Sequence, residues 1–311
     1  MSNAAYENWN RLKFDLGEKI LSLLDDDNVT EIMVNPDGSL WIEEHGKEIE
    51  EIGSISPEKT KMIINTIASS LGKVVDLKNP TIGGELPYDG SRFQGVIPPN
   101  AIAPMFSIRK KAIKILTLED YLNSGIITKN QKTILSDICR NRKNILISGA
   151  TGSGKTTFAN ALLKEVSIID PKCRMAIIED TRELQCDLKN KFALRTSEYR
   201  SMQDLLLDVL RLNVKRICIG EVRGAEAFTL LTAWNTGHGG GFATVHANNA
   251  KAGIQRIEQI LMAYNFKPVP QIIAEAINVI VSIQKSIEGR KVEEIVKVSY
   301  MNNDYVFEEI K

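Results

Sequence analysis

A glycine-rich segment near the middle of the chain has the residue types and spacing that bind nucleotide phosphates. It runs Gly149-Ala150-Thr151-Gly152-Ser153-Gly154-Lys155-Thr156 and is followed by Thr157. In this pattern the glycines let backbone N–H groups wrap a phosphate, the lysine reaches the β- and γ-phosphates, and the last hydroxyl ligates Mg²⁺. We therefore predict that residues 149–157 bind ATP with Mg²⁺, with Thr156 as a metal ligand.

Two carboxylates follow apolar segments that we expect to be strands beside this loop. Glu179 ends the segment 175–179, and Glu221 follows the segment 217–220, with Gly220 at the usual place of the Walker B aspartate. A phosphate loop needs an acidic residue at the end of a neighbouring strand, to organise magnesium or the attacking water. We predict that Glu221 and Glu179 are catalytic, with Glu221 also a candidate magnesium ligand; the residues alone do not rank the two.

Two of the three histidines lie around a glycine run at 239–241. His246 ends the apolar segment 242–246, where it could donate a hydrogen bond to a γ-phosphate oxygen. An ordinary packed or surface histidine would fit the same pattern. The residues by themselves make His246 a third catalytic candidate.

The segments that carry these residues alternate between short apolar runs and helical patterns. The expected strands are 145–148, 175–179, 217–220 and 242–246, and the expected helices are 155–166, 201–212 and 225–235. Apolar runs that alternate with helices indicate βαβ units around a buried parallel sheet. We therefore predict an α/β nucleotide-binding domain over residues 118–311, with helices 118–123 and 128–140 at its start.

The first 110 residues mix helical and extended patterns, which predicts a separate α+β domain over residues 1–110. Helices are expected at 11–24 and after Ser56-Pro57, and strands at 31–34, 40–43, 91–97 and 105–109. Serine followed by proline is typical of a helix start. The basic segment from Lys110 predicts a linker over residues 111–117. Two domains suit a chain of 311 residues.

Composition limits the partners and the compartment. Lys plus Arg equals Asp plus Glu at 39 each, which argues against strong direct nucleic-acid binding. The four cysteines are far apart, without the paired spacing of a zinc or disulfide framework. The N-terminus has no apolar run typical of a signal peptide, and the apolar stretch 272–283 is too short to cross a bilayer. We therefore expect a cytoplasmic protein.

Four segments match one family in order and spacing: GATGSGKTT at 149–157, IIEDTREL at 177–184, ICIGEVRGAEA at 217–227 and GHGGGFATVHANNA at 237–250. They resemble the Walker A, Asp box, glutamate-type Walker B and His box of the traffic ATPases of type IV secretion, type II secretion and type IV pili. LPYDGSRFQG at 86–95 and FSIRK at 106–110 resemble the N-terminal domain of conjugal-transfer ATPases of the TrbB-like branch. The lack of a tetracysteine metal-binding insertion disfavours the type II branch.

This resemblance implies an α/β fold with a RecA-like C-terminal P-loop ATPase domain and a smaller N-terminal α+β domain. It also implies a motor that couples ATP hydrolysis to domain closure in a homo-hexameric ring. Arg92 and Arg109 would reach the nucleotide from the N-terminal domain, and His246 would sense it. The implied location is cytoplasmic and peripheral to the inner-membrane face, with the secretion or conjugation machinery as partner.

The chain departs from the family pattern at two places. Arg211 is not followed by the usual Pro-Asp turn, so no intersubunit role is carried over to it. The three glycines at 239–241 exceed the usual number and predict a looser loop.

Three alternative functions stay open. A pilus assembly or retraction ATPase is the nearest to the motor interpretation. A P-loop small-molecule kinase and a nucleotide-gated scaffold that barely hydrolyses ATP belong to other classes, and ATP turnover without an acceptor would discriminate against both.

Overall fold

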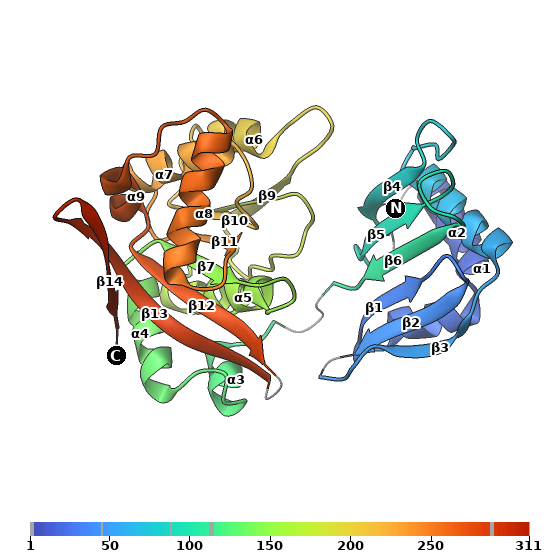
Figure 1. The fold of residues 1–311 in the computed structure, drawn as a ribbon, viewed down its shortest axis with the longest axis horizontal. Coiled ribbons are helices and arrows are strands. Elements are labelled where there is room, and N and C mark those ends of the chain that lie inside the picture. Colours follow the sequence, from blue (N-terminus) through green and yellow to red (C-terminus); the bar gives the residue numbers. More distant parts are fainter. Residues whose placement is uncertain (1–2, 45, 88, 112–114, 287–288, 311) are drawn as a thin grey trace. The chain divides into compact units, whose positions relative to one another are not determined.

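The computed structural model describes residues 3–44, 46–87, 89–111, 115–286 and 289–310, and the side chains of residues 3–10 lie outside this description. The chain forms two compact units, Met1–Ile113 and Lys114–Lys311 (Figure 1). The boundary between them falls inside the predicted linker 111–117. No helix among the described residues is long and apolar enough to cross a membrane.

A six-stranded antiparallel sheet and two helices make up the first unit. The helices are α1 (Asn3–Asp25) and α2 (Pro57–Ser70), and the strands are β1 (Val29–Val34), β2 (Ser39–Glu44), β3 (Glu50–Ser54), β4 (Thr81–Glu85), β5 (Arg92–Val96) and β6 (Met105–Arg109). The strand order is β3-β2-β1-β6-β5-β4. Both helices share one apolar core with the sheet, which is an α+β arrangement as predicted.

Apolar residues that predict helices in this unit are buried in its core. Leu12 and Leu16, one helical turn apart, are buried on α1. This helix begins before the predicted residue 11 and is kinked at Gly17, whose φ is 74°. The Ser56 hydroxyl caps α2, as its sequence predicts. The patterns do not predict β3 and β4, whose sequences EEIGS and TIGGE contain few apolar residues.

An eight-stranded mixed sheet with helices on both faces forms the second unit. Its strands are β7 (Ile145–Gly149), β8 (Met175–Glu179), β9 (Lys191–Arg195), β10 (Arg216–Ile219), β11 (Phe242–His246), β12 (Val279–Ser286), β13 (Gly289–Met301) and β14 (Asp304–Glu309). Its helices are α3 (Leu118–Asn123), α4 (Lys129–Arg140), α5 (Lys155–Ile169), α6 (Met202–Val209), α7 (Glu226–Asn235), α8 (Ala250–Ala263) and α9 (Pro270–Ala276). The strand order is β14-β13-β12-β7-β11-β10-β8-β9. The six strands from β12 to β9 are parallel, and β13 and β14 are antiparallel at one edge.

The core of this unit lies in two clusters, one on each face of the sheet. Helices α3, α4 and α5 contribute to one cluster, and α6 to α9 contribute to the other. Along β7, Leu146 belongs to one cluster while Ile145 and Ile147 belong to the other, because successive side chains of a strand point to opposite faces. The apolar runs are therefore strands buried on both faces, as predicted.

The observed elements of the second unit differ from the predicted ones in one helix end and in several additional helices and strands. The four predicted strands correspond to β7, β8, β10 and β11, but α6 ends at Val209, three residues before the predicted helix end. The patterns do not predict α8, α9, β9, β12, β13 and β14. Most of these lie after the last predicted strand; β13, for example, mixes buried and exposed residues and has no continuous apolar run.

The prediction of a loose loop at Gly239-Gly240-Gly241 is wrong. The backbone N–H groups of Gly240 and Gly241 both donate to Asn144 Oδ1, at 2.7 and 3.3 Å. The buried Arg216 guanidinium donates to the Gly240 carbonyl at 3.0 Å. A Cβ on Gly241 would stand only 2.0 Å from the Ile217 carbonyl oxygen. The glycines therefore allow close packing at the amino end of β11, the opposite end of that strand from the phosphate loop.

Candidate nucleotide-binding site

The predicted phosphate loop connects β7 to α5. In the parallel sheet β7 is followed by β11, β10 and β8, so the carboxyl ends of these four strands meet at one edge. The register places His246, the last residue of β11, opposite Gly149, the last residue of β7. The sheet thus brings together the ends of the strands that carry the predicted site residues, at the edge where α/β sheets bind ligands.

The backbone of the loop is shaped to hold an anion. Gly152 and Gly154 have φ values of 73° and 96°, a region that only glycine adopts without strain. Gly154 is the N-cap of α5 and makes no side-chain cap hydrogen bond. The Ser153 hydroxyl oxygen is buried and, within the described chain, has no hydrogen-bond partner. A phosphate group would satisfy these donors, since the first N–H groups of a helix have no partner inside the helix.

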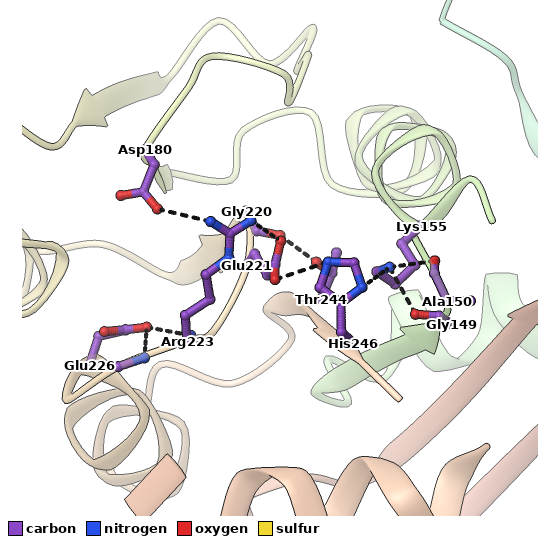
Figure 2. Close-up of polar contacts among 11 residues, drawn as sticks. Gly149, Ala150, Lys155, Asp180, Gly220, Glu221, Arg223, Glu226, Thr244 and His246 are labelled. Carbon is purple, nitrogen blue, oxygen red and sulfur yellow. Dashed lines mark hydrogen bonds and ion pairs between the residues drawn. The ribbon is translucent and has the colours of Figure 1, made fainter. Parts of the chain in front are cut away.

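Lys155 connects the phosphate loop with His246 at the end of β11 (Figure 2). Its Nζ donates to the carbonyl oxygens of Gly149 and Ala150, both at 2.9 Å, and lies 3.1 Å from His246 Nδ1. Because an ammonium can only donate, His246 Nδ1 accepts, and the ring proton is on Nε2. His246 Nε2 lies 3.2 Å from Glu221 Oε1. Lys155, His246 and Glu221 therefore form a continuous polar chain that starts at the phosphate loop.

Two pKa shifts describe the charge of this chain. Burial and the Lys155 charge lower the pKa of His246, and the Glu221 charge opposes them. Burial works to raise the pKa of Glu221, but a hydrogen bond from Arg223 and the charges of Arg223, His246 and Lys155 outweigh it, so this pKa is lowered. At neutral pH the carboxylate is therefore ionised while the imidazole is neutral.

Arg223 is a functional candidate that the motif pattern alone does not indicate. Its guanidinium donates to Glu221 and lies 4.0 Å from Asp180 Oδ2, so it joins the segments after β10 and β8. Glu226 fixes this turn by accepting the backbone N–H groups of Arg223 and Gly224, both at 2.8 Å (Figure 2). The signal in the sequence was a basic residue two positions after the Walker B glutamate.

Glu179 has a different environment from Glu221. It is buried, and its Oε1 accepts the backbone N–H groups of Glu183 and Leu184, at 3.0 and 2.7 Å. A Cβ on Gly220 would stand 3.1 Å from Glu179 Cγ. The glycine in the Walker B position therefore leaves room for the Glu179 side chain, which folds the following loop.

The magnesium site would rest on few protein groups. Thr156 and Thr157 are half-buried in the first turn of α5. The part of the chain that the structure describes contains no cluster of three or more His, Cys, Asp or Glu that could hold a metal. Mg²⁺ often binds through one or two protein oxygens together with phosphate oxygens and water, and the Thr156 hydroxyl suits this mode. Glu221 as a direct ligand stays a prediction.

Arg92 and Arg109 lie side by side on the first unit. They are paired across β5 and β6, so their exposed side chains share one face of the sheet. Arg109 Nε also lies 3.9 Å from Glu31 on the neighbouring strand β1, and the Ser107 hydroxyl donates to the same carboxylate at 2.6 Å. The structure thus brings the two arginines together, and their contact with nucleotide stays a prediction.

Comparison with known proteins places this site in a family. The family model described as type II/IV secretion system protein matches residues 16–299. The probable conjugal transfer protein TrbB of Sinorhizobium fredii is 43% identical over 299 residues, which cover 96% of this chain and 92% of the relative.

A type IV secretion relative and a solved structure agree with this result. The type IV secretion system protein PtlH of Bordetella pertussis is 33% identical over 270 residues, covering 76% of this chain and 78% of the relative. The solved structure of the pilus retraction motor PilT with bound ADP has the same fold, with a TM-score of 0.65 and 20% identity over 94% of this chain and 82% of that one. The fold is therefore the predicted one, and the chain belongs to the type II/IV secretion system protein family.

Proposed function

We propose that this protein is an ATP-hydrolysing motor of a type IV secretion or conjugative transfer system. The observation that carries the proposal is the chain of Lys155, His246 and Glu221 at the mouth of a complete phosphate loop. Two relatives, a conjugal transfer protein and a type IV secretion protein, support the assignment to such a system. They favour this branch over a pilus ATPase.

The chemistry follows from the groups that surround the loop. Lys155 leaves the carbonyl oxygens of Gly149 and Ala150 and donates to the β- and γ-phosphates instead. The Thr156 hydroxyl would hold Mg²⁺, which would supply further positive charge to the phosphate oxygens. His246, which is neutral and protonated on Nε2, contacts Lys155 through Nδ1 and Glu221 through Nε2, and so couples the positions of these two side chains. Catalysis then depends mainly on position and charge neutralisation, as is usual for phosphoryl transfer.

Of the two glutamates, we assign the orientation of the attacking water to Glu221. Its carboxylate is ionised and lies beside His246, whereas one oxygen of Glu179 already holds the loop after β8. Glu221→Gln should lower kcat by about 10²-fold or more while ADP affinity stays unchanged, because only an interaction made in the transition state is lost. Glu179→Gln should mainly lower stability. A larger kcat loss in Glu179→Gln, with stability intact, would reverse the assignment.

The finer parts of the proposal rest on family membership. They are a homo-hexameric ring that couples hydrolysis to domain closure, and Arg92 and Arg109 as nucleotide-binding residues. The basic segment from Lys110 supports residues 111–117 as the linker. Membership of a secretion family also supports a position at the cytoplasmic face of the inner membrane, with the secretion or conjugation machinery as partner. The test of the ring is specific ATPase activity over a range of protein concentrations. A steep rise supports a site completed between subunits, and a constant value argues for a self-sufficient monomer.

A further inference from the structure

The hairpin of β12 and β13 lies against the phosphate loop from the side away from β11. Strand β12 pairs with β7, and Arg290 is the second residue of β13. The Arg290 Cδ and Nε atoms would stand 3.1 and 3.2 Å from a Cβ placed on Gly154. Gly154 is the N-cap of α5, so the arginine side chain runs directly past the positive end of the phosphate-binding helix.

Among the residues that the structure describes, no carboxylate balances the charge of Arg290. Its side chain is exposed, and within that part of the chain it makes neither a salt bridge nor a side-chain hydrogen bond. The residue opposite it in the hairpin is Lys285, also a cation. Tyr121 also lies near it: burial raises the pKa of this phenol, and the Arg290 charge opposes the rise. A cation that has no counter-ion among the described residues and lies beside a phosphate loop suits an anionic ligand.

The strand order indicates which part of the nucleotide Arg290 meets. His246 and Glu221 lie on the β11 and β10 side of β7, whereas Arg290 comes from the β12 and β13 side. The γ-phosphate must lie at the hydrolysis machinery. The α-phosphate and the nucleoside should therefore lie on the opposite side of the loop, beside β12 and β13.

We infer that Arg290 is a further nucleotide-binding residue, which contacts the α-phosphate end of bound ATP or ADP from within the same unit. The inference rests on the proposed function. A guanidinium can grip phosphate oxygens with two parallel N–H groups, which a lysine cannot do. Because the α-phosphate is the same before and after hydrolysis, Arg290 stabilises the ground state and the transition state equally. Its loss therefore weakens binding and leaves the chemical step unchanged.

The test compares variants of the full-length protein by ADP titration and ATPase kinetics. Arg290→Ala should raise the Kd for ADP and the KM for ATP by about tenfold, the effect of one charge-assisted hydrogen bond, with kcat within about twofold of the wild type. The Kd and KM of Arg290→Lys should lie between those of the wild type and Arg290→Ala, because lysine keeps the charge but lacks the planar guanidinium group. Lys291→Ala is the matched control, since the next residue of the strand points to the opposite face, and it should bind ADP like the wild type.

The outcomes separate this inference from the proposed function. Wild-type ADP affinity in Arg290→Ala, with binding lost in Lys155→Ala, would overturn the role of Arg290 and leave the ATPase proposal standing. A lower kcat with unchanged ADP affinity would also overturn it, since Arg290 would then act on the chemical step. A wild-type protein that binds no nucleotide would refute the proposed function itself.

Discussion

Gly220→Asp would install the aspartate of a conventional Walker B motif, and we predict that it damages this protein. A Cβ at Gly220 would stand 3.1 Å from Glu179 Cγ and 3.5 Å from Glu179 Oε1. The new carboxylate would therefore lie beside the buried carboxylate that accepts the N–H groups of Glu183 and Leu184. The prediction concerns the free energy of unfolding, with a loss of ATP turnover as its consequence.

The magnitude follows from the charges and the contact distance. Two like charges about 4 Å apart repel by about 4 kcal/mol at an effective dielectric constant of about 20. Relaxation of the two side chains reduces this, so Gly220→Asp should lose about 3 kcal/mol of unfolding free energy. Gly220→Ala retains only the tight contact with Glu179 and should lose about 1 kcal/mol. The difference between the variants isolates the charge.

Urea unfolding of five proteins tests this reasoning: the wild type, Gly220→Ala, Gly220→Asp, Glu179→Gln, and the double variant Gly220→Asp with Glu179→Gln. If repulsion is the cause, the double variant should be more stable than the sum of its single changes predicts, by about 1–3 kcal/mol. Equal stability of Gly220→Asp and Gly220→Ala would refute the reasoning. So would strictly additive behaviour in the double variant.

Three further predictions address charge, packing and the first unit. The folded-state pKa values of His246 and Glu221 are lowered, so the unfolded chain binds more protons below their ordinary values of 6.5 and 4.5. Stability should therefore fall as the pH decreases. In His246→Ala, the thermal unfolding midpoint should depend less on pH between about pH 7 and pH 5 than it does in the wild type, and an unchanged pH dependence would contradict this. Gly241→Ala should lower the free energy of unfolding by about 3 kcal/mol, because its Cβ would meet backbone at 2.0 Å, and a thermal midpoint like that of the wild type would show that the loop can yield. Arg92→Ala and Arg109→Ala should reduce ATP turnover with stability changed by less than about 0.5 kcal/mol, since both side chains are exposed, and wild-type turnover in both would remove them from the site.

The sequence predicts the parts of the fold whose pattern is local. The strand β7, the loop after it and the helix α5 follow from residues that are contiguous in the chain. The buried strands β8, β10 and β11 are continuous apolar runs. By contrast, β9 alternates between exposed and half-buried residues, so no such run marks it. The packing of Gly241 could not be predicted, because it depends on Ile217 and Asn144, which are distant in the sequence.

The site shows the same division between local and distant information. The roles of Lys155 and Thr156 follow from the motif alone. Which of Glu221 and Glu179 orients the attacking water stays open until the surroundings of both side chains are known. Hydrogen bonds from the loop after β8 occupy Glu179, and His246 and Arg223 surround Glu221. Those contacts join residues from three strands, which spacing along the chain does not reveal.

The most direct test of ATP hydrolysis at this site is steady-state ATP turnover of the purified protein with Mg²⁺ and without any acceptor, compared with that of Lys155→Ala. We predict measurable turnover in the wild type and its loss in the variant, because Lys155 neutralises the phosphate charge. Turnover in Lys155→Ala equal to that of the wild type would show that hydrolysis does not depend on this phosphate loop.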